Sequence, residues 1–175
     1  MIVDISDERI VSWVLEGKVF IYPTDTVYGL GCDATNESAV QRIREIKGST
    51  KPFSVVAPSK QWIRKYCRYG KELEKLPGPY TFLYTSTAQV ACNNHSGILG
   101  IRLPAHPFTA YIAQAGVPFV TTSVNRTGER PIQQIQDVPQ EILQKVDIIV
   151  NVGPIRGKPS TIIDYSQDEA KTVRL

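Results

Sequence analysis

Helix and strand signals alternate along almost the whole 175-residue chain, and this alternation restricts its fold more than any other feature. Asn36 can cap a helix that has apolar residues at helical spacing and ends at Gly48. Short apolar runs typical of buried strands, such as residues 53–57, lie between the helices. Alternating elements predict an α/β sheet flanked by helices. Because the last strands follow each other without a helix, we expect a twisted mixed sheet.

The boundaries of the expected elements come from caps, glycine stops and prolines. Ser6, Asn36 and Ser59 are expected to cap the first three helices, and the first two should end at Gly17 and Gly48. Two more helices are expected near residues 107–114 and 139–145. Strands are expected at residues 18–22, 53–57, 98–103, 118–122, 147–151, 161–165 and 172–175, and one more after the turn at 77–79. With 42% hydrophobic residues and this length, we expect a single domain over residues 1–175.

Composition indicates a cytoplasmic protein without disulfide bonds. The chain has no run of about 18 apolar residues, and its first ten residues, MIVDISDERI, lack the features of a signal peptide. The three cysteines are widely spaced and form no CxxC pair, so small buried thiols are expected. A net charge of +3 favours an anionic ligand only mildly.

Three short motifs resemble known ligand sites, but each lacks part of the pattern that such a site requires. GPIRGKPST at 153–161 has three residues between its glycines, and a proline follows its lysine, so it is not a phosphate loop. YGLGCDA at 28–34 is not followed directly by a helix, as a dinucleotide site requires. CNNH at 92–95 has no second ligand pair to complete a zinc site. We therefore predict no metal site formed by protein ligands alone.

Two predicted strands end in polar residues. TTSVNRTGERP at 121–131 and YPTDTVYGL at 22–30 place hydroxyl, amide and backbone NH groups where open α/β sheets bind ligands. Both segments can face one cleft, although a polar turn remains an alternative for the first.

Two basic segments are either exposed to solvent or bind a negatively charged ligand, and the sequence leaves both interpretations open. EIKGSTKPFSVV at 45–56 holds Lys47 and Lys51 around a glycine stop, and it can be a solvated connection or an anion cradle. Arg64, Arg68 and Lys71 begin a stripe that continues to Lys75 among aromatic residues, which is either a solvated helix face or an RNA surface.

Seven blocks in this order carry a family resemblance: YPTDTVYGLGCDA, Lys47-Gly48, LPGPYT, LGIRLPAHP, TSVNRTG, GKPSTIID and TVRL. Together they resemble the YrdC/TsaC family of threonylcarbamoyl-AMP synthases. The resemblance implies one YrdC-like α/β domain with a basic cleft. It implies formation of threonylcarbamoyl-AMP and pyrophosphate from ATP, L-threonine and bicarbonate, for the t6A37 modification of tRNA. It also implies Mg²⁺ bound with the substrate ATP, a downstream threonylcarbamoyl transferase complex, a contact with tRNA or double-stranded RNA, and no membrane.

The resemblance also implies roles for individual residues. Lys47 would be catalytic, and our hypothesis on the loop that follows it adds Lys51. ATP would contact Lys47, Ser123, Asn125 and Arg174, and the same loop hypothesis adds Ser49 and Lys51 to its contacts. L-threonine would contact Thr26, Arg102, Thr121 and Ser160.

The loop after Lys47 departs from the family pattern. Lys47-Gly48-Ser49-Thr50-Lys51-Pro52 is shorter by two residues and lacks the family's arginine. Our hypothesis is that the shortening brings Lys51 toward the volume that the arginine would fill. The alternative function is that of a YciO-like paralogue or an RNA-binding module with little or no synthase activity.

Overall fold

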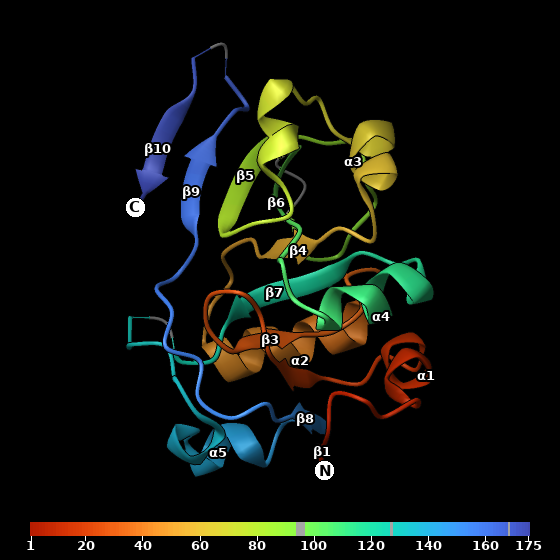
Figure 1. The fold of residues 1–175 in the computed structure, drawn as a ribbon, viewed down its shortest axis with the longest axis vertical. Helices are drawn as coiled ribbons and strands as arrows, with labels where there is room; N and C mark the ends of the chain where they lie inside the picture. The colour runs from red at the N-terminus through yellow and green to blue at the C-terminus, as the bar shows by residue number, and fades with distance from the viewer. Residues whose placement is uncertain (94–96, 127, 168) are drawn as a thin grey trace.

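The structure is a computed structural model that describes residues 1–93, 97–126, 128–167 and 169–175. Its strands form one sheet in the order β1-β8-β2-β3-β7-β4-β6-β5-β9-β10. Figure 1 shows this sheet running from the N-terminus near β1 to the C-terminal strand β10.

The strands are β1 (Ile2–Val3), β2 (Phe20–Tyr22), β3 (Gly29–Gly31), β4 (Ser54–Val56), β5 (Tyr80–Thr85), β6 (Ile98–Arg102), β7 (Phe119–Ser123), β8 (Ile148–Val150), β9 (Thr161–Asp164) and β10 (Lys171–Arg174). The helices are α1 (Ile10–Leu15), α2 (Glu37–Lys47), α3 (Lys60–Tyr66), α4 (Phe108–Ala115) and α5 (Gln140–Leu143). Two 3₁₀ turns are η1 (Lys71–Lys75) and η2 (Ile135–Asp137).

Strand pairing confirms the predicted mixed sheet. β2 pairs parallel with β8 and antiparallel with β3. β4 pairs parallel with β6 and antiparallel with β7. Antiparallel neighbours therefore occur within the sheet as well as at its C-terminal edge, where β10 pairs antiparallel with β9.

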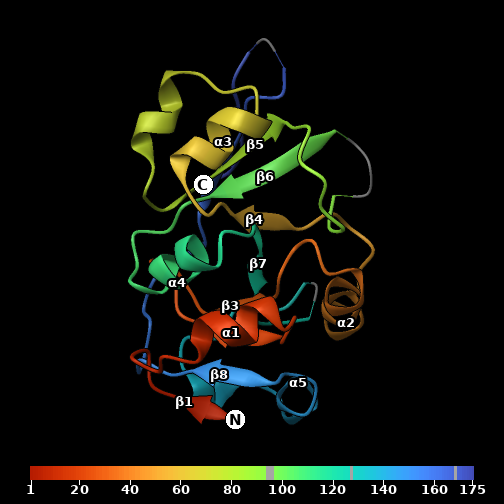
Figure 2. The ribbon, with the colours of Figure 1, turned by 90° about the vertical axis from the view of Figure 1, so that its right-hand side faces the viewer.

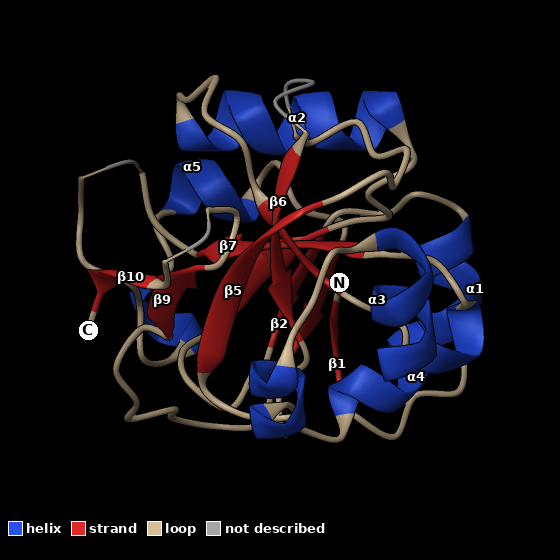
Figure 3. Ribbon diagram, turned by 90° about the horizontal axis from the view of Figure 1, so that it is seen from above, coloured by secondary structure: helices blue, strands red, loops and turns tan. Residues whose placement is uncertain are grey.

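Two apolar cores lie on opposite faces of the sheet. Along β2, Ile21 belongs to the core that contains Ile43 of α2 and Ile142 of α5. Its neighbours Phe20 and Tyr22 belong to the other core, with α1 and α4. Successive strand residues point to opposite faces, so β2 separates the two cores. Figure 3 shows α2 and α5 on one side of the strands and α1 and α4 on the other, and Figure 2 shows α1 and α4 from their own side.

Two of the three predicted helix caps are confirmed. The Asn36 side chain accepts from the Ala39 NH at 3.0 Å, and α2 ends at Gly48 with a φ of 58°. The Ser59 hydroxyl accepts from the Trp62 NH at 3.1 Å at the start of α3. These caps satisfy NH groups that a helix leaves without intrahelical partners. The local sequence therefore determines where α2 places its last residue, Lys47.

The predicted start of the first helix is wrong. Helix α1 begins at Ile10, and Ser6 does not cap it. The Ser6 NH and hydroxyl both bond to the carboxylate of Asp4, at 2.9 and 2.7 Å. Asp7 likewise accepts from the Arg9 NH. Short polar side chains compete for nearby NH groups in this way, and the segment forms turns until Ile10.

Strand β3, which the sequence did not predict, explains the YGLGCDA segment. Its three residues pair with β2 on one side and with Thr122 and Ser123 of β7 on the other. A Cβ atom on Gly31 would lie 2.2 Å from the Val120 carbonyl oxygen, so no larger residue fits. The glycines therefore allow close packing between strands. β1 and the two 3₁₀ turns were also not predicted.

Two expectations from composition can be compared with the structure. The three cysteines, Cys32, Cys67 and Cys92, are buried free thiols, as predicted. Among the residues described, no helix is long and apolar enough to cross a membrane. Asn94 and His95 of the CNNH motif lie outside the described residues.

Candidate active site

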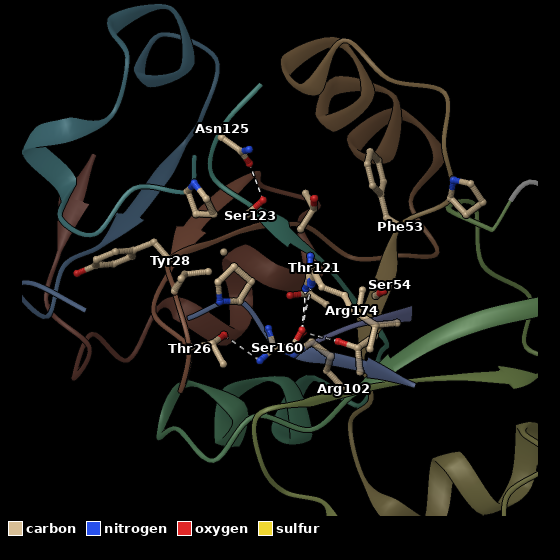
Figure 4. Close-up of a pocket in the computed structure, with 18 of the residues that line it drawn as sticks. Thr26, Tyr28, Phe53, Ser54, Arg102, Thr121, Ser123, Asn125, Ser160 and Arg174 are labelled. Carbon is tan, nitrogen blue, oxygen red and sulfur yellow. Dashed lines mark hydrogen bonds between the residues drawn. The ribbon is translucent and has the colours of Figure 1, made fainter. Parts of the chain in front are cut away.

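A pocket of about 340 Å³ lies where polar ends of several strands meet. Seven of the predicted site residues line it, and Figure 4 shows their side chains gathered around one space: Thr26, Arg102, Thr121, Ser123, Asn125, Ser160 and Arg174. They come from five strands or strand ends that are far apart in the sequence. The expectation that the 22–30 and 121–131 segments face one cleft is confirmed, since residues of both line this pocket.

Arg102 forms one wall of the pocket and is only 7% exposed. Its Nη2 atom donates to the Asp25 carboxylate at 2.9 Å and to the Thr26 hydroxyl at 3.0 Å. Asp25 also accepts from the Ala105 NH at 3.0 Å, so both carboxylate oxygens are used. The buried Nε atom has no hydrogen-bond partner among the described residues. Burial lowers the pKa of the guanidinium.

Thr24 shapes the turn that presents Thr26. Its hydroxyl donates to the Val27 carbonyl at 2.7 Å and accepts from the NH groups of Thr26 and Val27. It also lies 3.0 Å from the Thr26 hydroxyl. Both threonines are 3% exposed. The side chain of Thr24 therefore satisfies the backbone of a buried turn and fixes Thr26 beside Arg102.

Arg174 brings a second guanidinium to the pocket from the C-terminal strand. It donates to the Ser160 carbonyl from Nη2 at 2.9 Å and from Nε at 3.2 Å. A register shift lies between Thr172 and Arg174, where β10 pairs with β9. Bulges of this kind redirect side chains. Burial and the nearby charge of Arg102 both lower the pKa of Arg174. The two cations are therefore close enough to repel each other in the absence of an anion.

Lys47 lies at the end of α2 and is 6% exposed. Its Nζ atom donates to the Ser123 carbonyl at 2.8 Å and to the Asn125 side-chain oxygen at 2.7 Å. The Ser123 hydroxyl donates to the same Asn125 oxygen at 2.5 Å. Burial lowers the pKa of Lys47 to about 8, while the charge of Glu129 opposes this shift. Lys47 thus supports two pocket-lining residues from behind with a charge that titrates near neutral pH.

Residues 48–51 of the loop after Lys47 are not among the described residues that line the pocket, whereas Pro52 is. Lys51 is exposed, and its backbone NH donates to the Ser49 hydroxyl at 3.2 Å. The Lys51 carbonyl accepts from Arg44 Nη1 at 2.9 Å, and the Arg44 guanidinium lies over the Phe53 ring. Neither Ser49 nor Lys51 is among the described residues that line the pocket. The roles given to these two residues stay predictions. The loop is held by Arg44, which the sequence analysis did not consider.

The basic stripe does not lie on one helix. Arg64 belongs to α3, whereas Lys71 and Lys75 belong to η1, and Arg68 lies between them. Glu74 pairs with Lys60 at 3.0 Å and with Arg64 at 3.4 Å. A carboxylate therefore neutralises part of the positive charge here, which favours the interpretation as a solvated surface over an RNA surface.

Several residues at or near the pocket were not singled out by the sequence analysis. Asp25, the partner of Arg102, had a usable signal, because an acid at the end of a predicted strand needs a cation or NH partner when it is buried. Tyr28, Glu129 and Pro131 lie in the two segments that were expected to face the cleft. The others lie on or beside strands whose neighbours the sequence cannot show: Ser54, Thr81, Pro159 and Ile162.

The described residues contain no group of three or more His, Cys, Asp or Glu side chains that could hold a metal ion. Glu129 is the carboxylate residue among those that line the pocket. Its Oε2 atom accepts from the Arg126 NH at 3.1 Å.

The fold and pocket define a class of protein: an α/β protein whose strand ends hold a pocket lined by two arginines and by hydroxyl and amide side chains. The sequence model of the Sua5/YciO/YrdC family, described as telomere recombination, matches residues 12–175. The chain therefore belongs to this family.

Individual relatives agree with this assignment. The chain is 35% identical over 158 residues to a protein of Xanthomonas euvesicatoria pv. vesicatoria named threonylcarbamoyl-AMP synthase, covering 82% of this chain and 84% of that protein. The crystal structure of P. abyssi Sua5 complexed with L-threonine aligns with a TM-score of 0.86 and 26% identity, over 99% of this chain. The chain spans 56% of that protein's length. E. coli YciO aligns with a TM-score of 0.84 and 26% identity, over 99% of this chain and 92% of that one.

Proposed function

We propose that this protein is a threonylcarbamoyl-AMP synthase that uses ATP, L-threonine and bicarbonate and releases pyrophosphate. The observation that carries the proposal is the convergence of two guanidinium groups, Arg102 and Arg174, on one pocket with buried hydroxyl groups. The names of the relatives support it, as does the threonine complex of P. abyssi Sua5.

The proposed reaction needs no covalent protein intermediate. The amine of threonine adds to carbon dioxide to give a carbamate, and a carbamate oxygen attacks the α-phosphorus of ATP. The bond from that phosphorus to the bridging oxygen breaks, and pyrophosphate leaves with the electron pair. Positioning and charge neutralisation are what such a displacement requires from the protein. Guanidinium, hydroxyl and amide donors are the groups that the pocket offers.

Each wall of the pocket suits one substrate. Arg102 lines the pocket with its Nη2 atom bonded to Thr26, and it is the proposed partner of the threonine carboxylate. Ser123 and Asn125 would contact ATP at the opposite wall, with Lys47 behind them. Arg174 lies next to Ser160, and the charge of the nearby Arg102 helps to lower the pKa of Arg174. It would neutralise phosphate charge near the junction of the two substrates.

We propose that Mg²⁺ enters with the triphosphate of ATP. Magnesium in nucleotide sites commonly keeps several waters and binds phosphate oxygens, with few protein ligands. The pocket fits this arrangement, because Glu129 is the lining carboxylate and could accept from a magnesium-bound water. The ion would supply neutralisation of phosphate charge.

The remaining partners belong to the same proposal. The product would pass to a downstream threonylcarbamoyl transferase complex for t6A37 modification of tRNA, which places the protein in the cytoplasm. The curated relatives named as synthases favour this function over that of a YciO-like paralogue.

A direct assay tests the proposal. Purified protein is incubated with ATP and Mg²⁺, and pyrophosphate is measured with threonine and bicarbonate each present or omitted. We expect formation only when both are present. Arg102→Ala should abolish the threonine-dependent release of pyrophosphate. Arg126→Ala is the matched control, because Arg126 is exposed and pairs with Glu141. Pyrophosphate release that does not depend on threonine would contradict the proposal, and no release under any condition would favour the YciO-like alternative.

A further inference from the structure

The segment LPGPYT, residues 76–81, ends in the pocket-lining residue Thr81, to which the proposed function gives no role. The Gly78 NH donates to the Leu103 carbonyl at 3.0 Å, just after β6. The Thr161 NH donates to the Pro79 carbonyl at 3.0 Å, at the start of β9. These two hydrogen bonds hold the start of β5 between its neighbours β6 and β9. They place Thr81, the second residue of β5, in the lining of the pocket.

Thr81 lies 2.7 Å from Ser160, measured between the two side-chain oxygens, and either hydroxyl can be the donor. Both residues are buried, with 3% and 5% exposure. Arg174 Nη2 donates to the same Ser160 hydroxyl oxygen at 3.3 Å and to the Ser160 carbonyl at 2.9 Å. Figure 4 shows Arg174 directed at Ser160 from the strand that lies next to it. Ser160 therefore links Thr81 to Arg174.

The sheet register keeps this arrangement in place. Thr81 pairs with Ile162 across β5 and β9, and Ile162 pairs with Arg174 across β9 and β10. Directly paired residues place their side chains on the same face of a sheet. All three line the pocket. The position of Thr81 is therefore determined by strand pairing and does not depend on a surface loop.

The direction of the hydroxyl bond decides what Ser160 offers to a ligand. When Ser160 donates to Thr81, its oxygen presents only lone pairs to the pocket, and these repel an anion. When Thr81 donates to Ser160, the Ser160 hydrogen can turn toward an anionic oxygen in the pocket. When Thr81 donates, the Ser160 oxygen accepts at 2.7 Å from a buried hydroxyl, a shorter bond than the one from Arg174 at 3.3 Å, and the Ser160 hydrogen is left for a ligand.

We propose that Thr81 is a positioning residue, which orients the Ser160 hydroxyl toward the anionic group of the amino-acid substrate and steadies Arg174 through Ser160. The identity of that substrate rests on the function proposed above. The arrangement of hydroxyl and guanidinium groups does not depend on it.

Thr81→Val tests the role, because valine keeps the shape of threonine and cannot donate. We expect the KM for threonine to rise about 3- to 10-fold, as for the loss of one neutral hydrogen bond, with kcat within about two-fold of the original. Thr81→Ser should restore both constants. Thr85→Val is the matched control, because Thr85 lies exposed on the same strand. If Thr81→Val does not fold, Thr81→Ala takes its place.

A second readout needs no substrate. The Nε–H resonance of Arg174 in the free protein, identified by its loss in Arg174→Lys, should shift in Thr81→Val and stay in place in Thr85→Val. The proposal is overturned if Thr81→Val matches Thr85→Val in both readouts, or if Thr81→Ser is as impaired as Thr81→Val. Wild-type protein that forms no pyrophosphate would refute the proposed function, and the resonance would still decide whether Thr81 positions Arg174.

Discussion

At the scale of single residues, Lys47 is a buried side chain with an ionisable ammonium group. Its ammonium donates to two neutral oxygens, the Ser123 carbonyl and the Asn125 side chain, and burial lowers its pKa to about 8. A lysine with a lowered folded-state pKa destabilises the folded protein while it is charged. The free energy of unfolding therefore rises with pH between about 8 and the unfolded value near 10.5.

Lys47 also predicts a pH dependence of nucleotide binding. Lys47→Met should weaken ATP binding roughly 10- to 150-fold, the effect of losing about 1.5–3 kcal/mol from a charged hydrogen bond. In the wild type, ATP affinity should fall as the pH rises from 7 to 9, because the ammonium deprotonates near pH 8. Calorimetric titrations at several pH values check both points. Equal pH dependence in wild type and Lys47→Met would contradict this role, since both proteins share the titration of ATP itself.

The pair of Arg102 and Asp25 predicts a large effect on stability. Their side chains are 8% and 10% exposed, and their closest atoms are 2.9 Å apart. Removing one partner from a buried pair leaves an uncompensated charge, so Asp25→Asn should lower the free energy of unfolding by roughly 3 kcal/mol. Urea denaturation measures this change. Asp7→Asn is the control, because Asp7 pairs with the exposed Arg9 and its replacement should leave stability close to that of the wild type.

At the scale of elements, helix α2 connects local sequence to the site. The Asn36 cap and the Gly48 stop determine its length, and its last residue is Lys47. Asn36→Ala should lower the free energy of unfolding by about 1 kcal/mol, because the Ala39 NH loses its partner. Thermal or urea unfolding checks the value. Asn36→Asp, which keeps an acceptor, should stay close to the wild type, and an equal loss in both variants would rule out the cap as the cause.

The segment from Asn151 to Ser160 connects β8 with β9 and passes closely over Thr26. A Cβ atom on Gly157 would lie 1.9 Å from the Thr26 carbonyl oxygen, so Gly157→Ala must displace one of the two backbones. Because Thr26 bonds to Arg102, we expect the KM for threonine to rise at least several-fold. Lys158→Ala, on the exposed neighbouring residue, should leave it unchanged. Steady-state kinetics with both variants decide between the two outcomes.

At the scale of the whole molecule, the sequence predicted most elements because caps and stops are local signals. Asn36 and Ser59 act as predicted, and only nearby NH groups are involved. β3 could not be predicted, because two of its three residues are glycines, and such a segment forms a strand here only because it pairs with β2 on one side and β7 on the other. The residues of the pocket show the same difference between local signals and long-range pairing. Family motifs pointed to Arg102 and Ser160, whereas Thr81 depends on a pairing between strands about 80 residues apart.

The whole sheet also suggests that stability and ligand binding can be separated at its C-terminal edge. Every residue of β10 is exposed, and β10 pairs only with β9 among the described strands. Both apolar cores are formed by other elements. A chain that ends at Glu169 should therefore unfold cooperatively, with a urea midpoint near that of the wild type.

The same truncated chain lacks Arg174, so its ATP affinity should fall roughly ten-fold or more, to the level of Arg174→Ala in the full chain. Circular dichroism during urea unfolding and ATP titration by calorimetry, performed on the same samples, test the two halves of the prediction. If truncation abolished cooperative unfolding while Arg174→Ala did not, β10 would be part of the folding unit. Its role would then extend beyond carrying Arg174 to the pocket.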